Sequence, residues 1–300
     1  MTAAPQQPIE HSPGGLGDWL LGLRSPSGQL PPNAMRRYLI AAMLTALAGI
    51  VAASLTIGPR IAVVAAVCGA AALIVEILFS QIRHKPLNGG GLVYGFLLAL
   101  LLPADIPLEM AAIGGAVAAL FGKEVFGGTG SHIFAPSLVG KGILVFSYKT
   151  ITGLGFTSVV SHPDAHLWLA LGLVCLFGTL LMTWARPANL RILSAALLAS
   201  VCVAVPLQHF GVLPFESVIE MFLANSYLFS ICVVACDPAI SPRDDEAKWL
   251  YGLMIGALAV LMACYSLYAE AAMSAILVAN LFVPTLDLLS QPRANQEAQA

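Results

Sequence analysis

Long apolar stretches alternate with short polar, glycine-rich or proline-rich breaks along most of the chain. Three stretches, 38–59, 167–185 and 249–269, lack Asp, Glu, Lys and Arg. Each is long enough to cross about 30 Å of hydrocarbon as a helix. The whole pattern predicts an all-α polytopic membrane protein with ten hydrophobic segments: 38–58, 61–82, 91–102, 107–122, 133–148, 166–185, 191–208, 217–236, 249–269 and 271–289.

Two of these segments are too short to span a bilayer. Segment 91–102 lies between "NGG" and Pro103, and segment 133–148 is short and contains Lys141. Short apolar segments interrupted by Gly or Pro are typical of half-helices, whose exposed backbone ends occur only where protein or a water-filled cavity covers them. We therefore expect interrupted helices inside the bundle.

An ordered set of short motifs occurs twice. The motifs "LPADIP" (102–107), "IGGAVAAL" (113–120) and "FAPSL" (134–138) return as "DPAISP" (237–242), "IGALAVL" (255–261) and "FVPTL" (282–286). Segments three to five then match segments eight to ten, and an offset of five inverts the second copy in the bilayer. Chance similarity among Ala/Gly/Leu-rich stretches is the alternative.

This repeat predicts a domain organisation with a site near the membrane midplane, between two inverted five-helix repeats. The expected parts are an N-terminal tail, the first repeat, a periplasmic loop, the second repeat and a C-terminal tail, at 1–35, 36–148, 149–165, 166–290 and 291–300. The first 35 residues are rich in Pro, Gly and Ser and have no long apolar stretch, which indicates a soluble tail and not a cleaved signal peptide.

Composition supports the membrane assignment. Hydrophobic residues make up 58% of the chain and charged residues 10%, which is more apolar surface than a soluble core of this size could bury. No basic run indicates a nucleic-acid partner. The six cysteines lie in apolar segments, which argues against disulfides. Cys232 and Cys236 share a helix face, but two thiolates are only half of an iron–sulfur ligand set, and no metal site is predicted.

The positive charges are distributed unevenly between the two sides of the predicted bundle. With the N-terminus inside, the other side receives only Arg60 and Lys149, and Lys141 is unassigned. By the positive-inside rule, both termini are expected in the cytoplasm. The inner side receives eleven cations: Arg24, Arg36, Arg37, Arg83, Lys85, Lys123, Arg186, Arg191, Arg243, Lys248 and Arg293.

The stretch "FGKEVFGGTGSHIFAPSLVG" (121–140) contains the main candidate chemistry. Lys123 and Glu124 stand where an apolar helix stops, and the glycines that follow permit positive φ. Amides before the next helix would be unpaired donors, suited to an anion, a carbonyl-rich ring or a polar loop of a partner. The alternative is that the glycines only let two half-helices pack closely. The candidate broken-helix set is Gly127, Gly128, Thr129, Gly130, Pro136 and, in the second repeat, Pro284.

Three further acidic residues are candidates for transport or coupling. Glu76 lies inside the second segment, where a carboxylate costs roughly 2.5–3.5 kcal/mol without a partner, so a functional or pairing role is expected. An ordinary pair with Arg83 near the interface is the alternative. Asp237 and Asp287 stand at the ends of segments eight and ten, where each could cap helix amides or bind a cation.

Three motifs in order resemble the RnfD/NqrB family of membrane subunits of ion-translocating electron-transfer complexes. They are "GKEVFGGTGSHIFAPSLVGKGILVFSY" (122–148), "VVACDPAISP…KWLYG" (233–252) and "YAEAAMSAILVANLFVPTLD" (268–287). The resemblance covers roughly residues 38–290. It implies two inverted halves akin to urea-channel-type transporters, a bacterial inner membrane, other membrane subunits as partners, and Na⁺ or H⁺ as the ion.

The resemblance also implies FMN bonded to a threonine in an Asp-Gly-x-Ser-Gly-Ala-Thr motif after segment five. The corresponding loop here, "KTITGLGFTSVVSHPDAH" (149–166), lacks Ser-Gly-Ala-Thr, and neither Thr152 nor Thr157 has the required context. Covalent FMN is therefore not expected, and non-covalent FMN or riboflavin is left open. His162 and His166 in the same loop are interpreted as ordinary loop residues.

These features favour a membrane subunit of an Rnf/Nqr-like complex without its own covalent flavin. Glu76, Lys123, Glu124 and the "GGTG" break would line the region between the repeats. An accessory role is expected, since no Ser/His/Asp or Cys/His set is arranged for catalysis. Two alternatives stay open: a stand-alone channel or transporter for a small polar solute or ion, and a structural assembly partner.

Overall fold

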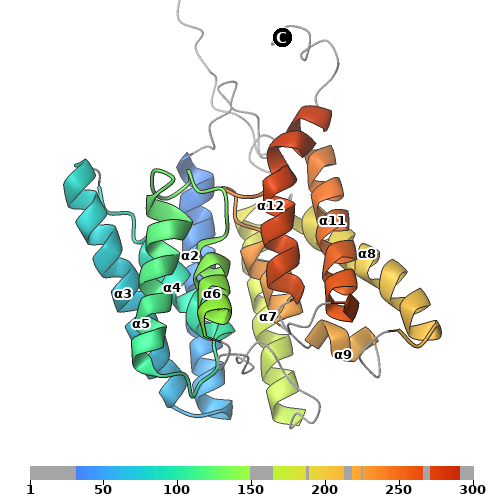
Figure 1. Ribbon diagram of the computed structural model, residues 1–300, viewed down its shortest axis with the longest axis horizontal. Helices are drawn as coiled ribbons and strands as arrows, with labels where there is room; N and C mark the ends of the chain where they lie inside the picture. Colours follow the sequence, from blue (N-terminus) through green and yellow to red (C-terminus); the bar gives the residue numbers. More distant parts are fainter. Residues whose placement is uncertain are drawn as a thin grey trace, which may run out of the picture.

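The described part of the protein is helical, with no strand among its residues (Figure 1). The structure is a computed structural model. It describes residues 32–84, 86–148, 165–186, 189–212, 218–223, 226–265 and 271–290. We call the described residues up to 148 the first half and those from 165 onward the second half.

The first half contains two long helices and three short ones. The long helices are α2 (Pro32–Thr56) and α3 (Arg60–Arg83). The short helices are α4 (Gly90–Leu101), α5 (Leu108–Ala119) and α6 (Pro136–Ser147). A π-helical turn, η1 (Leu120–Glu124), continues α5 and ends where the glycine-rich break begins.

The second half contains four long helices. They are α7 (Ala165–Ala185), α8 (Asn189–His209), α11 (Asp245–Tyr265) and α12 (Ala271–Ser290). Between α8 and α11 lie three short elements: α9 (Val218–Leu223), α10 (Tyr227–Phe229) and the π-helical turn η3 (Ser230–Val234).

The segment predicted at 217–236 is therefore not one helix. Ser226, at the start of α10, has φ 57°, a left-handed conformation that a continuous helix cannot contain. Pro284 also differs from its prediction, because it lies inside α12 and not at a break. Both short segments of the first half are confirmed as helices of 12 residues, too short to span a bilayer.

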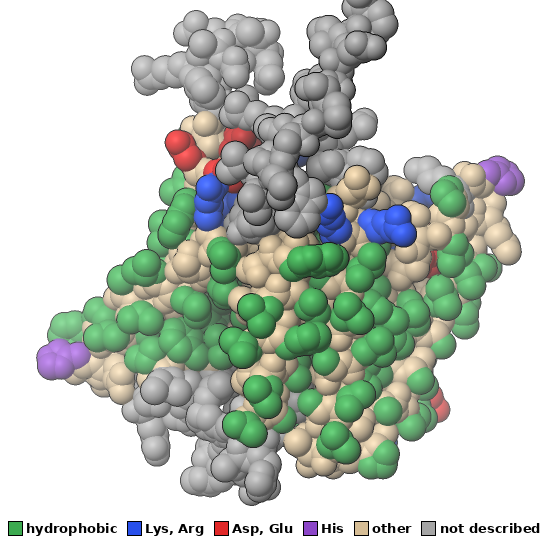
Figure 2. Space-filling view, turned by 180° about the vertical axis from the view of Figure 1, so that it is seen from behind, with side chains coloured by type: hydrophobic (Ala, Val, Ile, Leu, Met, Phe, Trp, Pro, Cys, Tyr) green, Lys and Arg blue, Asp and Glu red, His purple; other side chains and the backbone are tan. Residues whose placement is uncertain are grey.

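Five of the described helices are long and apolar enough to cross a membrane: α2, α3, α8, α11 and α12. In Figure 1, α2 begins and α12 ends at the same face of the bundle. Figure 2 shows Lys and Arg side chains gathered toward that face, above a broad band of hydrophobic side chains. The protein is thus a multi-pass membrane protein, as the sequence predicts.

Close helix contacts depend on small residues. A Cβ on Gly115 of α5 would lie 2.3 Å from the Cys68 carbonyl oxygen of α3. A Cβ on Gly256 of α11 would lie 2.2 Å from the Ala196 carbonyl oxygen of α8. Each half therefore has a helix pair whose backbones approach as closely as in small-residue packing of membrane helices.

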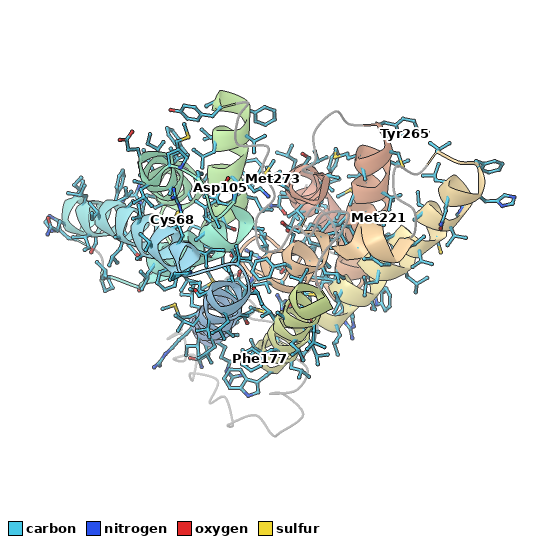
Figure 3. The ribbon with its side chains drawn as sticks, turned by 90° about the horizontal axis from the view of Figure 1, so that it is seen from below. Cys68, Asp105, Phe177, Met221, Tyr265 and Met273 are labelled. Atoms are coloured by element: carbon cyan, nitrogen blue, oxygen red, sulfur yellow. The ribbon has the colours of Figure 1, made fainter. Side chains whose placement is uncertain are left out.

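The two halves meet along α2 and α7 (Figure 3). A Cβ on Gly178 of α7 would lie 2.8 Å from the Thr45 methyl carbon of α2. A second contact lies between α6 and α12, where Met273 faces Gly142. The two halves are therefore joined by contacts of α2 with α7 and of α6 with α12.

Candidate functional site

Four charged side chains form a network at the end of η1, inside the first half. The Lys123 Nζ lies 2.8 Å from Glu76 Oε1 and 3.1 Å from Glu124 Oε1. Arg83 Nη1 lies 3.5 Å from Glu124 Oε2, and its Nη2 donates to the Glu124 carbonyl at 2.6 Å. Because Lys123, Glu76 and Glu124 are buried, the two carboxylates and two cations must balance one another locally.

Glu76 also makes a hydrogen bond at the beginning of α4. Its Oε2 accepts a hydrogen bond of 2.8 Å from the Gly91 amide, in the first turn of that helix. A carboxylate at this position satisfies one unpaired amide and faces the positive end of the helix dipole. The alternative pair of Glu76 with Arg83 is not formed, since Arg83 pairs with Glu124.

The glycines of the break serve conformation and not close packing. Gly127, Gly128 and Gly130 have φ of 113°, 103° and 91°. No heavy atom lies closer than 3.5 Å to a Cβ built on any of them. Close packing occurs instead at Gly122, whose Cβ would lie 2.5 Å from the Pro136 Cα at the start of α6.

A second buried polar cluster joins the two halves. The Tyr94 hydroxyl of α4 donates to Asp237 Oδ2 at 2.7 Å, and His132 Nε2 lies 3.0 Å from the same oxygen. Asp237 Oδ1 accepts from the Ala239 amide at 2.9 Å. Because a carboxylate oxygen accepts, the 3.0 Å contact is assigned as a hydrogen bond that His132 Nε2 donates to Asp237.

A third network holds the beginning of α11. Asp287 Oδ1 accepts from the Arg243 and Asp244 amides at 2.9 and 3.5 Å, as the capping alternative predicts. Asp245 pairs with Arg191 and accepts from Lys248 Nζ at 2.7 Å. Nearby, beyond the end of α7, burial lowers the pKa of Arg186 below its ordinary value.

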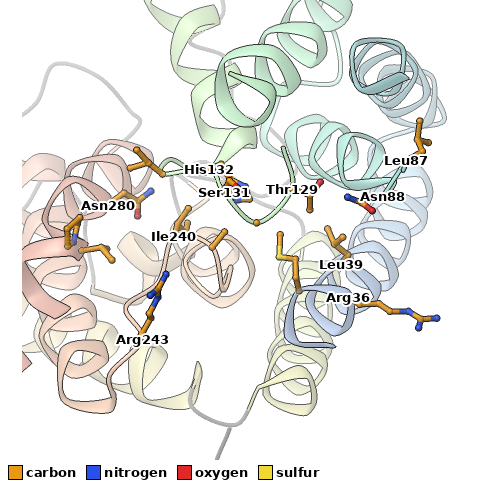
Figure 4. Close-up of a pocket in the computed structure, with 16 residues that line it drawn as sticks. Arg36, Leu39, Leu87, Asn88, Thr129, Ser131, His132, Ile240, Arg243 and Asn280 are labelled. Atoms are coloured by element: carbon orange, nitrogen blue, oxygen red, sulfur yellow. The ribbon is translucent and has the colours of Figure 1, made fainter. Parts of the chain in front are cut away.

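A pocket of about 950 Å³ lies between the halves (Figure 4). Thr129, Ser131 and His132 form its wall on the side of the first half, and Ile240, Arg243 and Asn280 form its wall on the side of the second. The first turns of α2 and the last part of α12 complete it, so the pocket lies toward the face where α2 begins. Pro284 belongs to this wall.

Unpartnered polar atoms are concentrated at this pocket. Eight buried side-chain atoms among the described residues have no hydrogen-bond partner, and three of them belong to the ion-paired cations Arg83, Lys123 and Arg191. Of the other five, three belong to pocket residues: Thr129 Oγ1, His132 Nδ1 and Asn280 Nδ2. A buried polar atom without a partner costs about 1–3 kcal/mol, so the wall of this pocket contains three unsatisfied polar groups.

The predicted site residues are thus divided between separate places. Glu76, Lys123 and Glu124 lie together, whereas Asp237 and Asp287 belong to the second and third networks. Thr129, Gly130 and Pro284 line the pocket, and Pro136 begins α6. Sequence reasoning missed Tyr94, His132 and Asn280. Only His132 gave a signal, as the one ionisable residue between the glycines and Pro136.

Several predictions fall outside the described residues or concern cysteines. Thr152, Thr157, His162 and the flavin loop lie in the undescribed range 149–164, and nothing structural is known of the His166 side chain. Cys232 and Cys236 are buried free thiols. Among the described residues, no group of three or more His, Cys, Asp or Glu side chains is arranged to hold a metal ion.

Comparison with known proteins identifies relatives over most of the chain. The model of the NQR2, RnfD, RnfE family matches residues 29–164 and 155–296. Similar proteins include subunits B of the Na(+)-translocating NADH-quinone reductase of Pseudomonas aeruginosa (strain LESB58), 28% identical over 254 residues, and of Klebsiella pneumoniae (strain 342), 30% identical over 260 residues. Each alignment covers 71% of this chain and 62% of the relative, so the chain spans less than two thirds of their length.

Proposed function

Because the chain belongs to the NQR2, RnfD, RnfE family, we propose that it is a membrane subunit of an Rnf/Nqr-type ion-translocating electron-transport complex. Its relatives named as subunits of a Na(+)-translocating reductase support this proposal. The structural observation that carries it is the Asp237–His132–Tyr94 cluster, which holds the interrupted segments of both halves together beside a pocket. Interrupted helices around a polar space are typical of ion-coupled transporters.

We propose further that the halves are inverted repeats of the urea-transporter type. The helices α3 and α5 are the second and fourth predicted segments, and α8 and α11 are the seventh and ninth. In each pair a glycine of one helix faces a backbone carbonyl of the other: Gly115 faces that of Cys68, and Gly256 faces that of Ala196. Equivalent pairs with equivalent contacts are what an offset of five segments requires.

We propose that the coupling ion is Na⁺ or H⁺ and that the Lys123 network regulates the movement of this ion. Glu76 and Glu124 both contact the Lys123 ammonium. A small cation between these carboxylates would replace that ammonium electrostatically, because two buried carboxylates without a cation repel each other. Asp237 and Asp287 are proposed to act at the junction of the halves, where they hold the amides that precede α11.

This ion-coupling role is testable in membrane vesicles. Glu76→Gln and Lys123→Ala are expected to reduce ion uptake while the protein still inserts into the membrane. An exposed loop carboxylate outside these networks, Asp105, supplies the control variant Asp105→Asn. Wild-type uptake by both network variants would contradict the proposal.

We propose that the chain lacks covalent FMN and that any flavin it holds, FMN or riboflavin, is bound without a covalent bond. The pocket between the halves has the volume of cavities that hold cofactor-sized ligands. A flavin would supply electron transfer, and Asn280 and Thr129 would supply hydrogen bonds to it. Ultraviolet fluorescence of the denatured protein band is the test, since covalent flavin would make the band fluoresce.

Both termini are proposed to lie on the cytoplasmic side of a bacterial inner membrane. The Lys and Arg side chains gathered toward the face where α2 begins support this orientation. The pocket would then be reached from the cytoplasm.

A second candidate function is a stand-alone transporter for a small polar solute. The pocket between the halves, with its unpartnered polar atoms, favours it. Solute uptake by the purified chain in vesicles, without other subunits, would distinguish this function from the first.

A further inference from the structure

The three polar networks differ in their balance of charge. In the Lys123 network two carboxylates face two cations, and in the third network Asp245 contacts two cations. The Asp237 carboxylate is 1% exposed and forms no ion pair with a Lys or Arg side chain among the described residues. The junction of the halves therefore contains a buried acid whose one ion-pairing partner is His132.

The other hydrogen bonds to Asp237 come from neutral donors. The Tyr94 hydroxyl donates to Oδ2, and the Ala239 amide donates to Oδ1. Neutral donors stabilise a carboxylate, but they do not cancel its charge, and a buried charge without an opposite charge is strongly unfavourable. The cluster would lose this unfavourable charge by binding one proton.

His132 has a free position for that proton. Its Nε2 is engaged with Asp237 Oδ2 at 3.0 Å, whereas its Nδ1 is buried and has no hydrogen-bond partner. The ring is 2% exposed and belongs to the wall of the pocket (Figure 4). A proton on Nδ1 would turn the existing contact into an imidazolium–carboxylate ion pair and leave the Nε2 hydrogen bond in place.

The other titratable groups near Asp237 are neutral. Tyr38 of α2 and Tyr251 of α11 are buried phenols that interact electrostatically with this carboxylate. Cys236 precedes it in the chain and is a buried free thiol. Phenols and buried thiols are uncharged at neutral pH, so none of these groups supplies the missing positive charge.

The charged groups around the cluster are directed to other partners or to water. Glu76, which interacts with Tyr94, is paired with Lys123. Arg186, beyond the end of α7, interacts with Cys236, Asp245 and Asp287. The remaining two, Arg36 and Arg243, line the pocket with exposed side chains.

We propose that His132 and Asp237 form a proton-binding site at the junction of the two halves. The proton binds to Nδ1 of His132, and the resulting ion pair joins the segment after the glycine break to the segment after η3. Loss of the proton leaves Asp237 buried without a cation and weakens this join. The effect of the site on ion movement rests on the proposed function, whereas proton binding itself is a property of the chain alone.

Proton binding is measured by nuclear magnetic resonance of the full-length chain in detergent, with ¹⁵N-labelled histidine. The chain contains six histidines, so a comparison of the wild type with His132→Asn identifies the His132 signals. An imidazole changes its charge between about pH 5 and 8, which sets the range of the titration. The His132 nitrogens should change from the neutral to the imidazolium form within this range as the pH falls.

Two variants of the partners of His132 should move the midpoint in opposite directions. Asp237→Asn removes the negative charge and should weaken proton binding at least about tenfold, which is one pH unit. Tyr94→Phe removes a donor from Asp237 Oδ2 and should strengthen proton binding, because more negative charge then faces the ring. Asp105→Asn, in an exposed loop, is the control and should leave the midpoint unchanged.

A His132 ring that keeps one charge state from about pH 5 to 8 would overturn the proposal. A midpoint that Asp237→Asn does not lower would also overturn it. If Asp237→Asn does not fold, the direction of the Tyr94→Phe shift decides, and a midpoint that does not rise in that variant counts against the site.

The role of the site in ion movement is tested in vesicles over the same pH range. Wild-type uptake should depend on pH, His132→Asn should abolish this dependence, and His209→Asn should retain it. His209 is the control because it is exposed at the end of α8. A pH profile that His132→Asn leaves unchanged would overturn the role in ion movement. A chain that binds the proton but takes up no ion would support the site and contradict the proposed function.

Discussion

The Lys123 ammonium lies 2.8 Å from the Glu76 carboxylate, across the helices α3 and η1, with 1% and 5% of the two side chains exposed. The same carboxylate accepts from the first turn of α4. One acidic side chain thus holds three elements of the first half together. These contacts stabilise the packing of α3, α4 and η1 against one another.

Removing Lys123 alone is expected to destabilise the protein strongly. Lys123→Met leaves Glu76 and Glu124 buried together, and breaking a buried ion pair from one side costs about 3–5 kcal/mol. The double variant Glu76→Gln/Lys123→Met should be more stable than Lys123→Met. Unfolding temperatures in detergent measure both, and equal values for the single and double variants would show that the pair is not coupled.

Gly91→Ala is expected to lower the unfolding temperature. Its Cβ would lie 2.8 Å from Glu76 Oε2 and 2.9 Å from the Ala72 carbonyl oxygen, so α3 and α4 would have to separate. Gly172→Ala is the matched control in α7, where no heavy atom lies within 4 Å of the new Cβ. The control should gain roughly 0.5–1 kcal/mol from helix propensity. Equal losses in both variants would contradict the packing account.

Asp237→Asn is expected to lower ion uptake by about tenfold or more while the protein remains folded. The amide keeps the size of the carboxylate but cannot accept from Tyr94 and His132 through a charged oxygen, and hydrogen bonds to charged groups contribute about 1.5–3 kcal/mol. Uptake in vesicles and the elution profile in detergent report on the two properties separately. Undiminished uptake would show that Asp237 is not required for ion coupling.

Ser226 lies in a turn, and substitutions of this residue test the backbone conformation there. It has φ 57°, so Ser226→Val should destabilise the start of α10 by about 1–2 kcal/mol relative to Ser226→Gly. The relative unfolding temperatures provide the check. A Val variant as stable as the Gly variant would mean that this turn relaxes freely.

The hydrophobic pattern was sufficient to predict the long helices, because the ability of a segment to span a membrane depends on its local composition. The sequence placed α3 at 61–82, one residue inside each of its observed ends. It failed at 217–236, a mostly apolar segment that also contains Glu220 and Asn225, because the backbone turns at Ser226. Apolar composition alone does not determine the backbone dihedral angles at which a helix is interrupted.

The site was only partly predictable, because its contacts are long-range. Tyr94 and Asp237 are 143 positions apart, and His132 and Asp237 are 105 apart. The burial cost of a carboxylate indicated that Glu76 needs a partner, and the position of Asp237 at a segment end indicated a cap or a cation site, but neither argument identified the partners. Asn280 gave no signal, since its neighbours in the sequence form an ordinary apolar helix.

The most direct measurement is gentle purification of the tagged chain from its native membrane, followed by mass spectrometry and visible absorption spectroscopy. The account predicts stoichiometric membrane subunits that carry flavin or iron–sulfur absorption. It also predicts that these subunits are lost less readily from Asp237→Asn than from Lys123→Met, which is expected to destabilise the first half. A chain that purifies alone, colourless and folded, would contradict its assignment to an electron-transport complex.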